Sequence, residues 1–182
     1  MQTRLLLMFL CIWSMNIAQI KTPEKSDSSV ILRGTDYAFS FSIPHGWILD
    51  TLERATMTAS KAVLYTNDTT FALDGIVIAT ATKKIEGKET LNNLLRYFAK
   101  QDSEFTPPVK RVVALSIATR DKKTAIIRDR IGGNGYMSAV AYIDDKNTVT
   151  VITLWRKTEV EFNKSIPAFN EVVQSYSSIA IN

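Results

Sequence analysis

Two neighbouring runs of β-favouring residues, Tyr136–Ile143 and Thr148–Arg156, constrain the fold more than any other part of the chain. Both runs are rich in Val, Ile, Thr, Tyr and Trp, and the polar segment Asp144–Asn147 separates them, which predicts a β-hairpin. Neither strand has a plainly polar face, because apolar side chains occupy both alternating sets of positions. Strands of this kind are typical of a sheet that is covered on both sides. We therefore expect the hairpin to lie in the middle of the sheet.

Five further segments have the composition of strands. Aromatic and small residues alternate in the first, whereas the third contains four consecutive apolar residues, as expected of a strand buried on both faces. The last two precede the hairpin, so four strands in sequence form an antiparallel meander. The link Gly132–Gly135 leads into a strand, whereas a phosphate-binding glycine loop leads into a helix, so we expect a turn there. The five predicted strands are Tyr37–Ile43, Lys61–Tyr65, Gly75–Thr82, Arg111–Thr119 and Thr124–Ile131.

Two segments have the apolar periodicity of amphipathic helices. Leu91–Lys100 carries one apolar stripe, and a second stripe runs to Tyr176 from a capping-box pattern at Thr158–Glu161. Pro167 interrupts the second segment, so we expect either two short helices or one kinked helix there. Together the elements predict an α+β fold, in which a central antiparallel β-sheet (a meander) has helices packed on both faces as an αβα sandwich.

The first 18 residues have the features of a secretory signal peptide. Arg4 supplies a positive charge, Leu5–Trp13 is apolar, and the small Ala18 offers a cleavage point. The apolar run is shorter than the ~20 residues that span a bilayer, although an uncleaved anchor is the alternative. Residues 19–29 lack apolar periodicity and predict a disordered linker, and one domain follows at residues 30–182. We therefore expect an exported protein, periplasmic or secreted.

Cysteine and charge usage limit the chemistry of this domain. Cys11 is the only cysteine and lies in the predicted signal, so the mature chain would have no disulfide, thiol nucleophile or cysteine-bound metal. The 22 basic residues are scattered among 18 acidic ones, unlike the basic clusters that bind nucleic acid. We expect no nucleic-acid partner, no cofactor and no metal, and a membrane contact only through a retained signal.

The segment Ile43–Trp47 contains a proline that ends a strand, a flexible Gly46 and a large aromatic residue. This combination predicts a tight turn from which Trp47 folds back to close the core. The segment is therefore interpreted as structural.

Candidate site residues are few. His45 is the only histidine, so any histidine-dependent triad or metal site must use it, and no Gly-x-Ser-x-Gly motif accompanies it. Asp129 shares strand parity with apolar residues, so an inward position would require a hydrogen-bonding or charged partner. Arg128 and Arg130 lie on the opposite parity and would present a small anion site, although solubility of a strand edge explains them equally. We assign no catalytic residue and keep these four as binding candidates.

Three phrases of the sequence resemble the PsbP-like and Mog-type superfamily: Phe39–Trp47, Ala141–Asp144 and Pro167–Tyr176. The resemblance spans nearly the whole predicted mature chain and implies a central antiparallel sheet with helices on both sides. It implies no single function, since the superfamily includes a lumenal photosystem II subunit, a Ran-binding factor and small bacterial envelope proteins such as DcrB. An exported chain without cysteine is closest in character to the DcrB kind.

Two function classes follow. The first is an exported non-enzymatic envelope protein, a binding or accessory module for a protein or small ligand. The alternative is a hydrolase or metal-dependent enzyme with a site built from dispersed acids near His45 and Asp129. A pocket that gathers His45, Asp129 and the two arginines favours the enzyme. For the binding module, we expect recognition by the loops Thr66–Thr70, Thr106–Lys110 and Gly132–Gly135, with help from Arg128 and Arg130.

Overall fold

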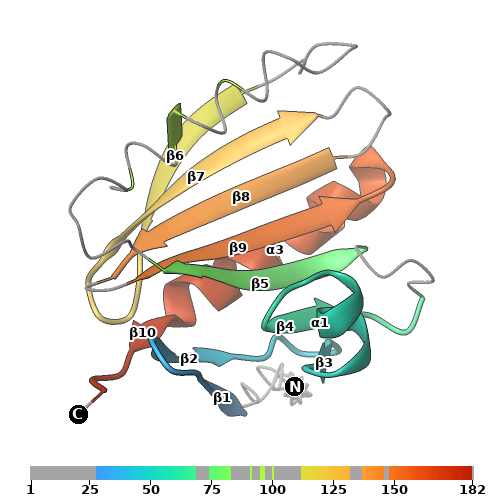
Figure 1. Cartoon of the computed structure of the whole chain (residues 1–182). Helices are drawn as coiled ribbons and strands as arrows, with labels where there is room; N and C mark the ends of the chain where they lie inside the picture. Colours follow the sequence, from blue (N-terminus) through green and yellow to red (C-terminus); the bar gives the residue numbers. More distant parts are fainter. Residues whose placement is uncertain are drawn as a thin grey trace, which may run out of the picture.

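The computed structural model describes residues 28–68, 74–82, 91, 95–96, 100, 112–131, 137–145 and 148–181, without the side chains of 81–82, 112–114 and 129–131. Two antiparallel sheets organise this part of the chain (Figure 1). The larger has seven strands in the order β3-β4-β5-β9-β8-β7-β6, and the smaller has three in the order β1-β2-β10. The elements are β1 Ser29–Arg33, β2 Ala38–Ser42, β3 Ile48–Asp50, α1 Glu53–Met57, β4 Ala62–Tyr65, β5 Gly75–Thr82, β6 Val112–Ala118, β7 Thr124–Ile131, β8 Met137–Asp144, β9 Thr148–Arg156, α3 Glu159–Ser175 and β10 Ser177–Ser178.

The predicted central hairpin is confirmed. Strands β8 and β9 pair in register from Met137↔Arg156 to Asp144↔Val149 and have two or more strands on either side. Every residue of β8 except Asp144 is buried, so both faces of this strand are covered. Odd-numbered residues of β8 join the core under α3, while Val140 and Tyr142 pack with the helical residues Leu91 and Leu95 on the other face.

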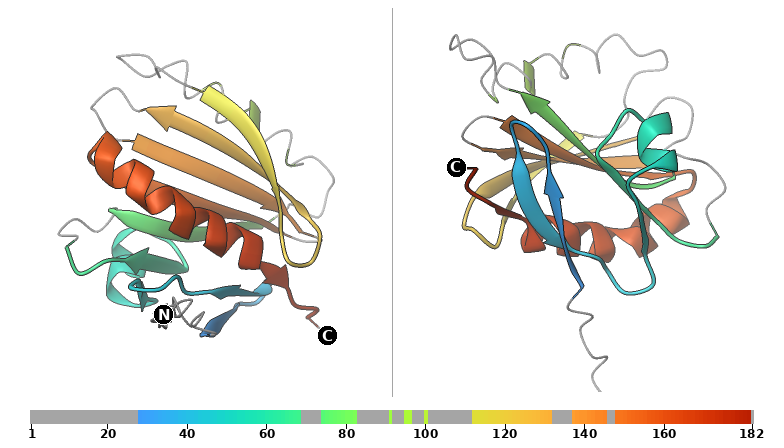
Figure 2. Two further views of the ribbon diagram at one scale, coloured as in Figure 1. Left: turned by 180° about the vertical axis from the view of Figure 1, so that it is seen from behind. Right: turned by 60° about the horizontal axis from the view of Figure 1, so that its bottom comes forward.

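Helix α3 lies across one face of the large sheet, as the reverse view in Figure 2 shows. Its N-cap is Thr158, whose Oγ1 accepts the Glu161 N–H at 3.2 Å, as the capping pattern predicted. Of the two alternatives expected at Pro167, two short helices or one kinked helix, the first is wrong, because α3 continues through Pro167 as one element. Pro167 and Asn163 are both exposed, so the carbonyl that loses its amide partner faces water, which makes the proline tolerable.

The three-stranded sheet was not predicted and corrects the expectation of one central sheet. Strand β2 pairs with β1 on one side and with the C-terminal β10 on the other, through Ser177↔Ser40 and Ser178↔Phe39. Phe39 and Phe41 point into the main core, and the Phe39 ring stacks on Tyr176 with centroids 5.2 Å apart. This small sheet therefore closes the core beside the C-terminal end of α3.

The sequence prediction of fold class is confirmed in its main part. The fold is α+β and mostly antiparallel sheet. The segment 91–100 is described at only four residues, so helices packed on both faces remain a prediction. The predicted linker ran to residue 29, whereas in the structure Ser29 is the first residue of β1 and pairs with Ser42 of β2. The predicted signal and the rest of that linker lie outside the described residues, and no helix in the described part is long and apolar enough to span a membrane.

The Ile43–Trp47 corner behaves as predicted. The Trp47 N–H donates to the Pro44 carbonyl at 3.1 Å, and Gly46 adopts a φ of +79°, which favours glycine at this position of a turn. The Trp47 ring is half-buried and packs against the main core. The corner therefore serves the fold by turning the chain and covering the core.

Candidate functional site

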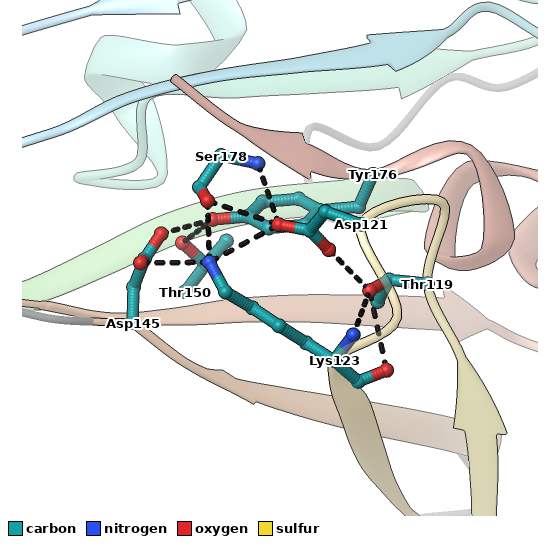
Figure 3. A network of polar contacts seen from close by, with 7 residues as sticks. All are labelled: Thr119, Asp121, Lys123, Asp145, Thr150, Tyr176 and Ser178. Atoms are coloured by element: carbon teal, nitrogen blue, oxygen red, sulfur yellow. Dashed lines mark hydrogen bonds and ion pairs between the residues drawn. The ribbon is translucent and has the colours of Figure 1, made fainter. Parts of the chain in front are cut away.

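Polar side chains from distant parts of the chain converge at one end of the large sheet. The β6–β7 turn supplies Asp121 and Lys123, the β8–β9 turn supplies Asp145, and the C-terminal segment supplies Tyr176 and Ser178 (Figure 3). In an antiparallel meander alternate turns lie at the same end of the sheet, which explains how the two turns meet. The C-terminal segment joins them because β10 pairs with β2 at this end.

The β6–β7 turn is fixed by reciprocal hydrogen bonds between its two ends. The Thr119 N–H donates to the Lys123 carbonyl at 2.9 Å, and the Lys123 N–H donates to Thr119 Oγ1 at 2.9 Å. Lys122 adopts a φ of +64°, the left-handed conformation that tight turns use. The turn thereby presents Asp121 and Lys123 toward the C-terminal segment.

Lys123 is the centre of the polar cluster. Its Nζ lies 2.7 Å from Asp145 Oδ1 and 3.1 Å from Asp121 Oδ2, and it also donates to Ser178 Oγ. An ammonium group has three hydrogens, so these three acceptors use its full donor capacity. One lysine thus links two hairpin turns and the C-terminal strand.

The two carboxylates of the cluster each have further partners. Asp121 accepts from the Thr119 hydroxyl at 2.5 Å, from the Ser178 N–H at 3.0 Å and from the Ser178 hydroxyl at 2.9 Å. Asp145 Oδ2 accepts from the Tyr176 hydroxyl at 3.2 Å, and the Tyr176 oxygen lies 3.1 Å from Thr150 Oγ1. The cluster therefore consists of two acids, one cation and neutral hydroxyl groups that hold them.

Each group whose pKa is shifted in this cluster is shifted away from neutral pH. Burial raises the pKa of Asp121, but hydrogen bonds from Thr119, Ser178 and Lys123 outweigh it and keep that pKa well below its usual range. Burial lowers the pKa of Lys123, but hydrogen bonds to Asp145 and Asp121 raise it overall. Burial, with the charge of Asp145, raises the pKa of Tyr176 despite its hydrogen bond with Thr150. At neutral pH Asp121 therefore stays negatively charged, Lys123 stays positively charged and Tyr176 stays neutral.

The chemistry that these contacts allow is electrostatic. A serine beside a lysine resembles a nucleophile with its general base, but a lysine can accept the serine proton only when it is neutral. The carboxylates keep Lys123 protonated, so it does not activate Ser178. Among the described residues, no group of three His, Cys, Asp or Glu side chains is placed to hold a metal ion.

A cavity of about 430 Å³ opens beside this cluster. Three segments line it: the β1–β2 turn, the β8–β9 turn and the C-terminal residues after α3. Asp145 and Ser178 belong both to the cavity wall and to the Lys123 cluster, so the cluster fixes two parts of the wall. The lining residues are Asp36, Tyr37, Ala38, Asp145, Thr148, Ser178, Ile179, Ala180 and Ile181.

The four site residues predicted from the sequence do not meet at one place. His45 is exposed in the turn before β3, while Arg128 lies on β7. Five strand positions separate β3 from β7, which corresponds to about 24 Å at the usual spacing of about 4.8 Å. His45 and Arg128 therefore lie in separate parts of the large sheet.

Arg128 contacts the helical residue Leu95, which packs on the face of the large sheet opposite α3. Its Nη1 donates to the Leu95 carbonyl at 3.5 Å, so it links β7 to the helical residues near 95. For Asp129 and Arg130 the structure describes only the backbone, which pairs with Ala139 and Ser138 of β8, and not the side chains. The binding role expected for these residues stays a prediction. Of the three loops expected to form a binding face, only Thr66–Asp68 is described.

Sequence reasoning missed the Lys123 cluster. Residues 120–123, between two predicted strands, and the polar segment Asp144–Asn147 were given no functional role, although both carry an aspartate and lie one hairpin apart in a meander. That spacing is a usable signal, because alternate turns share one end of the sheet. The C-terminal contribution had no such signal, since Ser177–Ser178 is too short to show a period.

A second buried constellation lies at the other end of β9. Arg156 Nη1 is 3.1 Å from Asp74 Oδ1, and its Nε donates to Ser165 Oγ at 2.8 Å. The Arg156 guanidinium also lies over the Trp47 ring, 5.1 Å from its centroid. This group joins the predicted corner to β5, β9 and α3, and we interpret it as structural.

No protein-family model matches the chain, and no curated protein matches it in sequence. Among solved structures, it is similar to LpqN, which is described as involved in cell envelope biogenesis of Mycobacterium tuberculosis. The TM-score is 0.56 at 12% identity, and the match covers 84% of this chain and 91% of LpqN. The solution structure of cyanobacterial PsbP (CyanoP) from Synechocystis sp. PCC 6803 also matches, with a TM-score of 0.49 at 13% identity over 83% of this chain and 92% of that one.

These comparisons concern the fold alone. At 12% identity, the likeness to LpqN shows a shared architecture and carries over no site residue. The closer likeness to DcrB-type proteins stays a prediction.

Proposed function

We propose that this protein is an exported, non-enzymatic accessory module of the cell envelope that binds a ligand in the cavity beside the Lys123 cluster. The observation that carries the proposal is the cavity itself, which residues 36–38, 145, 148 and 178–181 build together. Its volume of about 430 Å³ lies within the range of small-molecule sites, about 300–1,000 Å³. Its walls combine apolar side chains with a few polar groups, as such sites usually do.

The rigidity of the wall supports a binding role. Asp145 and Ser178 are tied to each other through Lys123, and the Ile179 N–H donates to the Ala38 carbonyl at 2.8 Å. These contacts fix all three lining segments before any ligand arrives. A preformed wall lowers the entropy cost of binding.

The fixed charges support a role other than catalysis. General acid and base catalysis works best with pKa values near the operating pH, and the cluster moves the pKa values of Asp121, Lys123 and Tyr176 the opposite way. Such groups suit positioning and recognition better than proton transfer.

Export is proposed from residues 1–18, and the fold shared with the envelope-related LpqN is compatible with it. The intact mass of the protein recovered from its own envelope fraction tests this part. Export with cleavage after Ala18 gives a chain that begins at Gln19. A recovered mass that includes Met1 or Cys11 contradicts cleavage.

Native purification from source cells tests the binding role. The bound small molecules are released by denaturation and identified by mass spectrometry, for the unmodified chain and for Ala180→Trp, which fills the cavity from an exposed lining position. Val160→Trp is the matched control, because Val160 is 64% exposed near the start of α3 and does not line the cavity. We expect the same molecule in the unmodified chain and Val160→Trp, but not in Ala180→Trp. Equal recovery from all three contradicts the cavity as the site.

A further inference from the structure

The charged side chains among the described residues that line the cavity are acidic. Asp36 and Asp145 line it, and none of the lining residues that the structure describes is a lysine, arginine or histidine. Lys123 lies behind Asp145 and spends its three hydrogens on Asp145, Asp121 and Ser178. Two further described cations lie close to the wall without lining it: Arg33 pairs with the lining Ala38 across β1 and β2, and Lys61 Nζ is 5.4 Å from the Tyr37 ring centroid. Both are exposed.

Asp36 is the carboxylate best placed to receive a ligand. It is exposed in the turn between β1 and β2, and it has no hydrogen-bond or ion-pair partner among the described residues. Asp145, by contrast, is held by Lys123 and Tyr176 and contributes negative charge from a fixed position. The two acids come from turns that the topology brings together at this end of the fold.

The remaining wall is largely apolar. Tyr37, Ala38 and Ala180 line the cavity together with Ile179 and Ile181, and Ile181 is 51% exposed. A ligand that matches this wall would bury apolar surface against it and would place a positive charge near the two carboxylates. An anion would instead face two carboxylates, with no cation among the described lining residues to compensate.

We propose that the cavity binds a small organic cation, in which a protonated amine or guanidinium faces Asp36 and Asp145 and a short apolar body lies against Tyr37 and the isoleucines. This inference rests on the proposed function and names the ligand class of the same site. Asp36 is the specificity-determining residue, and Asp145 is held in position by Lys123.

Three probes of equal chain length test the ligand class. Hexylammonium, 1-hexanol and hexanoate are each titrated into the ¹⁵N-labelled full chain, and backbone amide shifts are followed. We expect hexylammonium to shift the resonances of residues 36–38, 148 and 178–181 and to bind about fivefold or more tightly than 1-hexanol, the ratio that corresponds to an ion pair worth about 1 kcal/mol. Hexanoate should bind more weakly than either.

Two variants assign the charge to its residue. Asp36→Asn should weaken hexylammonium binding about three- to fivefold and leave 1-hexanol binding unchanged. Asp68→Asn is the matched control, because Asp68 is an exposed turn aspartate next to β4, outside the cavity. It should change neither affinity.

The outcomes separate the ligand class from the existence of the site. If 1-hexanol or hexanoate shifts the same amides as tightly as hexylammonium, the cavity binds ligands and the cation inference is wrong. If no probe shifts these amides, or if Ala180→Trp leaves all shifts unchanged, the cavity is not a binding site and the proposed function fails with it. A hexylammonium affinity that is unchanged in Asp36→Asn also overturns the inference.

Discussion

The buried ion pair between Arg156 and Asp74 gives the most quantitative test of this fold. Arg156 is 5% exposed and Asp74 is 8% exposed, and their closest atoms lie 3.1 Å apart. Removing one partner of a buried pair leaves an uncompensated charge and usually costs about 3–5 kcal/mol. Ser165 would still accept from Arg156 Nε, but a neutral hydroxyl does not replace the lost negative charge. We therefore expect Asp74→Ala to destabilise the protein by about 4 kcal/mol.

Urea unfolding followed by tryptophan fluorescence measures this effect. With a typical slope of about 2 kcal/mol per molar urea, a loss of about 4 kcal/mol lowers the unfolding midpoint by about 2 M. Asp68→Ala removes an exposed aspartate and is the control, with an expected change within about 0.5 kcal/mol. The second arm is Asp74→Ala combined with Arg156→Met, which removes both charges.

The double variant distinguishes charge from packing. If the cost of Asp74→Ala comes from the unpaired Arg156 cation, removing that cation restores part of the stability, so the double variant is more stable than the sum of the two single effects. A cost below about 1 kcal/mol for Asp74→Ala, or strictly additive losses, would refute the reasoning.

Three further predictions follow from the same structure. Trp47→Ala should lower the free energy of unfolding by about 2 kcal/mol in a thermal or urea melt. The expected loss is below the usual value of about 3–5 kcal/mol for a fully buried ring, because this ring is half-buried. An unchanged melt would show that the corner does not support the core. Since the folded-state pKa of Asp121 is depressed, its stabilisation is present above its unfolded pKa of about 4 and is lost as pH falls further. Asp121→Asn should therefore flatten the fall of Tm between about pH 4 and pH 2, and an unchanged acid limb contradicts this. Thr158→Ala should lower the free energy of unfolding by about 1 kcal/mol and Thr158→Ser by much less, since serine keeps the capping oxygen; equal losses would exclude the cap as the cause.

Local patterns in the sequence were sufficient for most strands of the large sheet. Gly75–Thr82 and Thr124–Ile131 have the observed bounds, because each apolar run ends at polar or turn-forming residues. The burial of β8 on both faces also followed from its sequence, since a strand without a polar face must be covered on both sides.

Local sequence patterns did not predict the pairing of strands that are distant in the sequence. Strand β10 has two residues and exists only because β2 offers it an edge, so no local signal marks it. Pro167 led us to expect two short helices or one kinked helix. The contacts of the buried apolar side chains of α3 with the core outweigh the one backbone hydrogen bond that Pro167 removes on the exposed side. Local propensity therefore failed where a segment depends on a distant partner.

The candidate site was predictable only in part. His45 was singled out as the only histidine and Asp129 because it shares strand parity with apolar residues, yet the strand order separates the two parts of the fold. Asp121, Lys123 and Asp145 looked like ordinary turn residues, and only the meander topology brings them together. The cavity also requires the C-terminal residues 179–181, whose sequence carries no mark of a site.

Photo-cross-linking at position 180 in source cells tests the central claim most directly. A compact diazirine amino acid, smaller than the tryptophan that fills the cavity, replaces Ala180 in the cavity wall in one variant and exposed Val160 near the start of α3 in another, and the intact mass of the purified protein is measured after irradiation. If the cavity is the binding site, position 180 acquires one defined mass adduct and position 160 acquires none. A protein that stays unmodified at position 180, or that is modified equally at both positions, would contradict the claim that this end of the sheet binds the ligand.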